Sequence, residues 1–238
     1  MTDSRLVIDL CGGAGATAQA VLDVAPARTR VVSLDSAAAM QRVGRRTLTD
    51  SRLSWITAPA EQLADHVHES ADAVVCNSAI WKTDVPAVFT AVRRVLRPSG
   101  RFVFNIGGGF AGITHPDEAI THTKPSLNSL IQQIAARDFG YVPPPVTGSP
   151  PKLPLHKVTE HLATAGMTVV ETEVTAQHST IAEKKAWLSI PVFSRPDGTL
   201  TFKQRMQILE AAYALIDPGA PTVTSWLVVV AQRPGRRP

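Results

Sequence analysis

The sequence predicts a doubly wound α/β fold, and three observations indicate it. In the first 106 residues, short apolar runs rich in β-branched residues alternate with helical patterns. These runs are too evenly apolar for exposed edge strands, as expected for strands buried on both faces of a parallel sheet. Parallel neighbours need right-handed crossover connections, so the helices between the runs are expected to cover both faces.

The elements of this part follow in order. Five strands are expected: Leu6–Leu10, Val31–Leu34, Leu53–Thr57, Ala73–Cys76 and Arg101–Ile106. Four helices are expected near 15–25, 37–47, 60–66 and 85–97. The last of these places Val88, Val92 and Val95 along one face, and the turn residues Pro98 and Gly100 end it.

The pattern changes after Ile106. Residues 107–153 start with several glycines, contain a helical stretch from Leu127 to Ala136 and end in a loop whose prolines cannot lie inside a sheet. A helix near 155–165 and a strand from Met167 to Val174 then resume the sheet rhythm. We therefore interpret 107–153 as an insertion.

A second insertion is expected at 177–223. It contains two helix starts with capping-box spacing, Thr180 with Glu183 and Thr201 with Gln204. A final strand, Ser225–Ala231, precedes a basic tail at 233–238. The prediction is one domain over 1–238 with two helical cap or lid insertions.

Composition excludes several classes of protein. The 238 residues are 44% apolar, enough for one sizeable core, but no apolar run approaches the roughly 18 to 20 residues of a membrane span. The N-terminus lacks the regions of a signal peptide, so a cytoplasmic protein is expected. Two cysteines are too few for a disulfide framework and do not form a zinc spacing, so no metal is expected.

The charge balance gives little reason to expect nucleic acid as a partner. The net charge is +4, and Arg233, Arg236 and Arg237 in the tail supply most of it. No basic stripe is visible elsewhere in the sequence, although folding could assemble one.

The strongest local signal is VIDLCGGAGATA at 7–18, where a strand ends in glycines and a helix begins. Glycines let the backbone approach a ligand closely, and the new helix offers free N–H groups. Asp35 follows at the tip of the second strand, where a carboxylate can accept both hydroxyls of a ribose. Gly13, Gly15 and Ala18 also satisfy the pattern of a nicotinamide dinucleotide, but neither tyrosine is followed by the lysine of a YxxxK dehydrogenase motif.

Further motifs follow in order: DSAAAMQRVGR at 35–45, ITAPAEQL at 56–63, DAVVCNSAIW at 72–81 and RRVLRPSGRFVF at 93–104. With DLCGGAG at 9–15 they resemble the class I S-adenosylmethionine-dependent methyltransferases, particularly the small-molecule branch with the ubiquinone and menaquinone biosynthesis C-methyltransferases. The resemblance implies a Rossmann-like seven-stranded methyltransferase sheet with a C-terminal antiparallel strand pair. It also implies S-adenosylmethionine as cofactor.

The resemblance assigns a set of cofactor-binding residues: Asp9, Cys11, Gly12, Gly13, Gly15, Asp35, Ser36, Met40, Ala60, Glu61, Asn77 and Ser78. Asp9 and the glycine loop would hold the methionine part, and Asp35 the ribose. Met40 would pack on the adenine, whose edge the backbone around Ala60 and Glu61 would contact. Asn77 and Ser78 would line the donor pocket.

The expected reaction is methyl transfer to oxygen or carbon of a small apolar or aromatic metabolite. Such acceptors often need a base, and His115 and His122 are the first candidates because they follow the fifth strand. Two alternatives stay open: an RNA or protein methyltransferase, and a cofactor-binding protein without methyl transfer. A homodimer is a further hypothesis.

Overall fold

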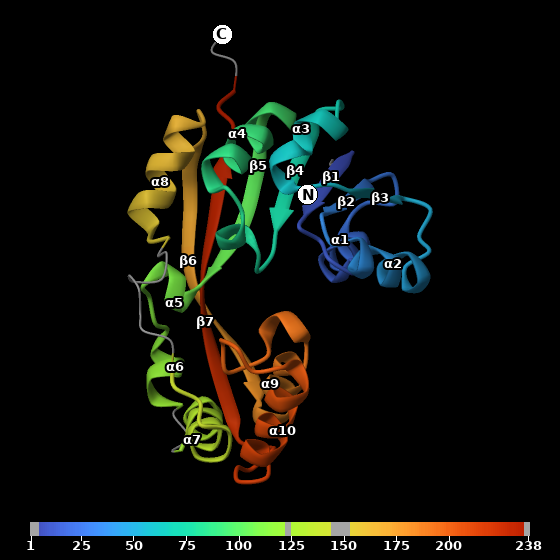
Figure 1. Ribbon diagram of the computed structural model, residues 1–238. Helices are drawn as coiled ribbons and strands as arrows, with labels where there is room; N and C mark the ends of the chain where they lie inside the picture. Colours follow the sequence, from blue (N-terminus) through green and yellow to red (C-terminus); the bar gives the residue numbers. More distant parts are fainter. Residues whose placement is uncertain (1–4, 122–124, 144–152, 236–238) are drawn as a thin grey trace. The chain divides into compact units, whose positions relative to one another are not determined.

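The computed structural model describes residues 5–121, 125–143 and 153–235, and its centre is one seven-stranded sheet (Figure 1). The strands are β1 Leu6–Leu10, β2 Arg30–Asp35, β3 Leu53–Thr57, β4 Ala71–Cys76, β5 Leu96–Gly107, β6 Thr168–Thr180 and β7 Pro221–Gln232. Their order across the sheet is β3-β2-β1-β4-β5-β7-β6. Strands β1 to β5 are parallel neighbours and β7 pairs antiparallel with β5, which confirms the predicted fold class.

Ten α-helices lie in the described residues: α1 Ala16–Val24, α2 Ala38–Thr47, α3 Leu63–His66, α4 Val85–Val95, α5 Gly108–Ala111, α6 Pro116–Ile120, α7 Leu127–Phe139, α8 Leu155–Thr164, α9 Ile181–Leu188 and α10 Phe202–Tyr213. Single 3-10 turns are η1 Ala60–Gln62, η2 Ile80–Lys82 and η3 Pro191–Phe193. None of these described helices is long and apolar enough to cross a membrane.

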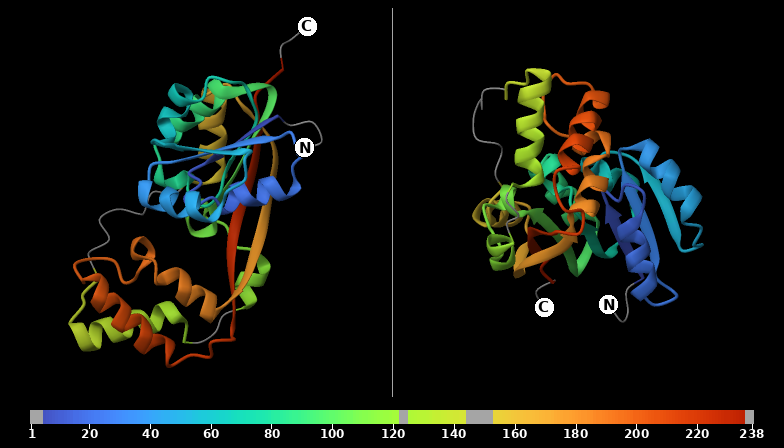
Figure 2. Two further views of the ribbon diagram at one scale, coloured as in Figure 1. Left: turned by 90° about the vertical axis from the view of Figure 1, so that its right-hand side faces the viewer. Right: turned by 90° about the horizontal axis from the view of Figure 1, so that it is seen from below.

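The parallel strands are buried on both faces, as their apolar sequences require. Ile8 and Leu10 share a core with residues of α3, α4 and α8, whereas their neighbour Val7 packs with α1 on the opposite face. This alternation follows from the two-residue period of a strand. Figures 1 and 2 show helices on both sides of the sheet.

The last three strands are longer than expected. Strand β5 starts at Leu96 rather than Arg101, β6 continues to Thr180 and β7 starts at Pro221. The sequence underestimates them because their outer parts lack apolar runs, and several of those residues are exposed.

The chain forms two compact units. The first holds residues 1–113, 152–174 and 226–238, and the second holds 114–151 and 175–225. Residues 108–111, expected within an insertion, form α5 in the first unit. The description of 107–153 and 177–223 as caps or lids therefore stays a prediction.

The second unit has a core of its own. Apolar residues of α7, α9 and α10 form it, including Leu130, Ile134, Leu188 and Ile208. Both predicted capping boxes are present, at Thr180 with Glu183 and at Thr201 with Gln204, and they start α9 and α10. The local sequence therefore predicts where these helices begin.

Candidate active site

The glycine loop of residues 11–15 leaves β1 and starts α1 in the first unit. Cys11, Gly13 and Gly15 all have left-handed backbone, with φ of 58°, 56° and 89°. The Gly15 N–H donates to the Gly12 carbonyl at 2.8 Å, which closes the turn. A Cβ at Gly15 would collide with the Trp55 ring, so glycine is required there for both conformation and space.

Asp9 lies directly behind this loop. Its side chain is 1% exposed, and Oδ2 accepts a hydrogen bond from the Ser33 hydroxyl at 3.0 Å. Oδ1 has no hydrogen-bond partner among the described residues. Burial raises the pKa of this carboxyl to about 6. A Cβ at Gly12 would collide with both Asp9 Oδ2 and Ser33 Oγ, so only a glycine at this position lets the loop lie this close to the carboxyl group.

Asp35 connects the tip of β2 to the loop. Its Oδ2 accepts the Gly13 N–H at 2.9 Å, and its Oδ1 accepts the Ala37 N–H at 2.7 Å. The residue is half-buried, and each oxygen keeps a lone pair for a further donor. Asp35 therefore positions the glycine loop and can also bind a hydroxyl-bearing ligand.

Ser36 and Met40 follow Asp35 and are both exposed. The buried residues of α2 are Gln41 and Gly44, so Met40 does not belong to the core. Its Cε lies 3.6 Å from where a Cβ of Gly13 would stand. Met40 is therefore placed beside the glycine loop, where a flat apolar ligand would contact it.

Gln41 is a residue that the sequence interpretation missed. It is buried, its Nε2 donates to the Ile56 carbonyl at 2.6 Å, and its Oε1 accepts the Thr57 hydroxyl at 2.7 Å. These bonds fasten α2 to the end of β3. A glutamine on a helix carries no sequence signal for that role.

Ala60 is buried in η1, and Glu61 follows it half-buried. The Glu61 side chain accepts the Asp84 N–H through Oε1 at 2.9 Å, just before α4. Its carboxylate therefore has a structural role at the helix start. Contact of the backbone of Ala60 and Glu61 with adenine stays a prediction.

Asn77 and Ser78 form a polar network at the end of β4. Asn105 of β5 joins them, because its Oδ1 accepts the Ser78 N–H at 2.6 Å and its Nδ2 donates to Asn77 Oδ1 at 2.8 Å. Ser78 has a φ of 58°, which this bond helps to hold. Asn105 was missed, although an asparagine that interrupts the apolar run RFVFNI is a usable signal.

Cys11 and Cys76 are free thiols on neighbouring strand ends. Hydrogen bonding with Cys11 and burial raise the pKa of Cys76 well above its usual range. Cys76 is fully buried, whereas Cys11 is half-buried in the glycine loop. Cys11 is therefore the thiol that a reagent can reach.

Alkylation with iodoacetamide is expected to weaken S-adenosylmethionine binding, because the added group on Cys11 would occupy the loop. The bound cofactor should protect the thiol, and the Cys11→Gly variant should keep binding after treatment. Glycine suits the left-handed backbone, so the free energy of unfolding of this variant should lie within about 1 kcal/mol of that of the wild type. Calorimetric binding before and after alkylation tests this. Full modification of Cys11 without loss of affinity would contradict it.

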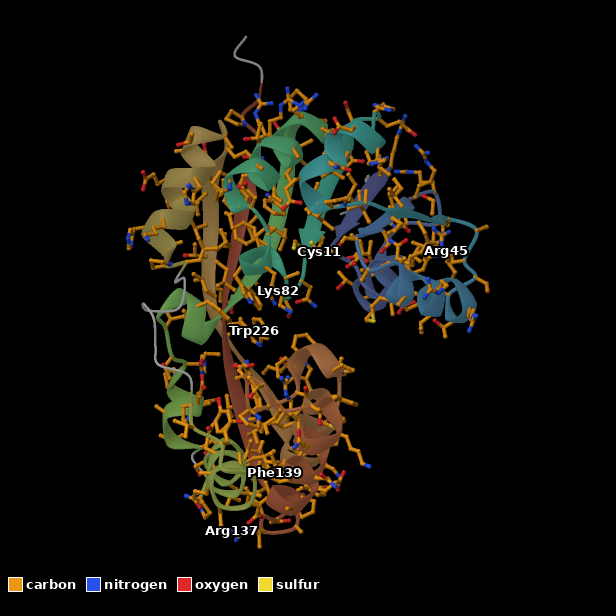
Figure 3. All side chains as sticks on the ribbon, viewed as in Figure 1. Cys11, Arg45, Lys82, Arg137, Phe139 and Trp226 are labelled. Atoms are coloured by element: carbon orange, nitrogen blue, oxygen red, sulfur yellow. The ribbon has the colours of Figure 1, made fainter. Side chains whose placement is uncertain are left out.

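Three aromatic rings lie at the same edge of the first unit. Trp81 of η2 stacks on Phe110 of α5 with ring centroids 5.1 Å apart, and the Trp226 centroid lies 5.9 Å from that of Trp81. Trp226 pairs with Gly107 at the carboxyl end of β5. Figure 3 shows Cys11, Lys82 and Trp226 along this edge. Burial lowers the pKa of Lys82.

The contacts described for His115, one of the two histidines expected as bases, are with residues of the second unit. His115 lies in the second unit, where its side-chain Nδ1 accepts the Asp117 N–H at 3.1 Å and its backbone N–H donates to Ser225 Oγ at 2.7 Å. A neutral His115 therefore carries its proton on Nε2 and must give up this bond to accept another at Nδ1. His122 lies outside the described residues, and both catalytic roles stay predictions.

Comparison with known proteins identifies the domain. Residues 7–100 match the family described as "Methyltransferase domain". No curated protein matches the chain. The match ends before the second unit begins, so it says nothing of that unit.

Solved structures share the fold over nearly the whole chain. The YcgJ protein from Bacillus subtilis is 14% identical, and the match covers 98% of this chain and 93% of that one with a TM-score of 0.59. The 4+2 cyclase SpnF is 12% identical, with coverage of 99% and 76% and a TM-score of 0.58. Phosphoethanolamine N-methyltransferase 2 from Haemonchus contortus, solved with S-adenosylmethionine, is 16% identical, with coverage of 98% and 50% and a TM-score of 0.52.

The match confirms the predicted methyltransferase class, and with it the predicted methyl donor, at the level of this domain. The residues also fit the cofactor: the loop of left-handed residues starts α1, and Asp9 behind it keeps a buried acceptor, Oδ1, without a partner among the described residues. Among the residues of the described ranges, no group of three or more His, Cys, Asp or Glu side chains could hold a metal ion.

Proposed function

We propose that this class I methyltransferase transfers a methyl group from S-adenosylmethionine to oxygen or carbon of a small apolar or aromatic metabolite. The observation that carries the proposal is the aromatic group of Trp81, Phe110 and Trp226 at the edge where the glycine loop lies. Stacked rings bind a flat apolar ligand with little loss of side-chain freedom. The resemblance of the motifs to the quinone-modifying branch supports the same acceptor class.

Bound S-adenosylmethionine would supply an electrophilic methyl on a sulfonium, which an acceptor displaces in line as the carbon–sulfur bond breaks. The chain's own task is then to align the acceptor and exclude water. In this proposal Asp35 and the glycine loop hold the donor, and Asn77, Ser78 and Asn105 shape the pocket beside it. His115 or His122 would take the proton of an oxygen or carbon acceptor.

Two other functions follow from the remaining hypotheses. A macromolecular acceptor would need a binding surface that leads to the donor edge, by which we mean the carboxyl ends of the parallel strands around the glycine loop. A protein that binds the cofactor without methyl transfer would give no methylated product. Because one similar structure is described as a cyclase, the assay must detect the transferred methyl itself. A homodimer and a cytoplasmic location stay predictions.

The test is incubation with methyl-labelled S-adenosylmethionine and a panel of phenols, quinones and lipid-like enols, followed by mass spectrometry. We expect a labelled product from at least one of them. Trp81→Ala should raise the KM for that acceptor about 10-fold or more, the scale of one lost aromatic contact, with unchanged affinity for S-adenosylmethionine. Trp187→Ala in the second unit is the matched control. Labelling of protein or RNA instead of any small acceptor would overturn the proposal.

A further inference from the structure

The amino ends of the parallel strands carry a row of arginines. Arg5 precedes β1, Arg30 begins β2 and Arg52 precedes β3. Their backbones are direct neighbours, because the Arg30 N–H donates to the Arg5 carbonyl and the Val31 N–H donates to the Arg52 carbonyl. Arg97 lies near the start of β5. The fold thus lines up cations that are far apart in the sequence.

A second group of arginines joins the row at β5 and β7. Arg93 and Arg94 stand in the last turn of α4, and Arg101 pairs in register with Gln232. Arg233 exchanges backbone hydrogen bonds with Ser99 and Gly100 and donates from Nη1 to the carbonyls of Arg93 and Leu96. We call the four arginines of this group and the four of the row the arginine edge.

Acidic partners neutralise only part of the arginine edge. Glu69 pairs with Arg30, Asp50 with Arg52 and Asp72 with Arg97. Arg5, Arg94 and Arg101 are exposed and have no side-chain ion pair within the described part of the chain. A surplus of positive charge therefore remains on this edge.

The carboxyl ends of two of the same strands, at the opposite edge of the sheet, carry acidic instead of basic side chains. The carboxyl ends of β1 and β2 carry Asp9 and Asp35 beside the glycine loop. An extended polyanion is attracted to the arginine edge and repelled by the donor edge. A ligand on the arginine edge is therefore not presented to the methyl donor.

We infer that the arginine edge binds the phosphate backbone of a nucleic-acid duplex. From β3 to β7 it crosses five strand spacings, roughly 24 Å, or about seven base pairs of a duplex, whereas a small anion needs only two or three guanidinium groups. All of its cations are arginines, whose planar groups bind phosphate through two hydrogen bonds.

Other polyanions fit less well. No aromatic side chain is among the exposed large apolar residues of this edge, so it lacks the stacking platform of a single-strand binder. Among the described residues, the exposed large apolar residues in elements that end or begin at this edge are Val24 and Val170, and a membrane surface would need more apolar anchors. Duplex binding through phosphates is independent of sequence.

The test is fluorescence anisotropy with a labelled DNA duplex of about 20 base pairs and the RNA duplex of the same sequence, between about 50 and 200 mM salt. We expect Arg94→Gln/Arg101→Gln to lower the slope of log affinity against log salt by about 1.8, and affinity at low salt by roughly 10- to 100-fold. Lys157→Gln/Lys203→Gln removes the same charge from exposed positions elsewhere and should leave both unchanged.

Thermal unfolding and S-adenosylmethionine binding of both double variants check that the fold is intact. If both double variants lost the same affinity for the duplex, net charge alone would explain binding, and the assignment to this edge would be overturned. Absence of salt-dependent binding would do the same. Displacement by poly-L-glutamate as effective as by duplex, or tighter binding to anionic phosphatidylserine vesicles, would assign the edge to an acidic protein or a membrane and also overturn it.

Discussion

Replacing Asp35 with alanine is expected to weaken binding of S-adenosylmethionine by at least about 100-fold. The carboxylate accepts the N–H groups of Gly13 and Ala37, so its loss releases the glycine loop from the tip of β2. In the proposed site the variant also loses its bonds to the ribose. Two charge-assisted hydrogen bonds at about 1.5 to 3 kcal/mol each account for that factor. Calorimetric titration with S-adenosylmethionine and S-adenosylhomocysteine measures it.

Asp65→Ala is the matched control, because it removes an exposed carboxylate of the same unit that has no part in the loop. It should bind both sulfur compounds like the wild type. NAD should bind neither wild type nor variant. Equal binding by Asp35→Ala and wild type, or a preference of the wild type for NAD, would contradict the site and restore the dinucleotide interpretation of the loop.

The sheet could be predicted because its signals are local. Each parallel strand is a short apolar run, and β1 and β3 begin and end at the predicted residues. The glycine loop and Asp35 were visible for the same reason, since they follow directly from strand ends. Gln41 was not, because its importance depends on its partners at the end of β3, whereas Asn105 left a local signal that the sequence interpretation missed.

The arginine edge shows this limit most clearly. Net charge along the sequence points to the tail, yet Arg5, Arg30 and Arg52 come together only when β1, β2 and β3 pair in register. Strand pairing converts a sequence with a small charge excess into a sheet with two differently charged edges. The net charge of the sequence does not show how the charges are divided between these two edges.

Asp9 is expected to make the stability of the cofactor-free protein depend on pH. Its pKa of about 6 in the folded protein exceeds the ordinary value of 3.8, so folding favours the protonated form. The carboxylate therefore destabilises the fold fully above about pH 6, and this cost disappears as the pH falls through 6 toward 3.8. The difference of about two pKa units amounts to about 3 kcal/mol.

The comparison with Asp9→Asn isolates this effect, because asparagine does not titrate and all other groups are common to both proteins. Between pH 7 and pH 4, urea unfolding should show the wild type gaining up to about 3 kcal/mol relative to the variant. If the free energy of unfolding changed with pH in the same way for wild type and variant, Asp9 would have no raised pKa.

The cofactor should remove this effect. The ammonium group of S-adenosylmethionine beside Oδ1 would favour the charged carboxylate, so saturating S-adenosylmethionine should abolish the gain in stability. Binding at pH 6 should then release protons, which calorimetry in buffers of different ionisation enthalpy detects, whereas Asp9→Asn should release none. The buried carboxyl would thus cost stability in the empty protein, and in the proposed site the ammonium group of the cofactor would stabilise it as the anion.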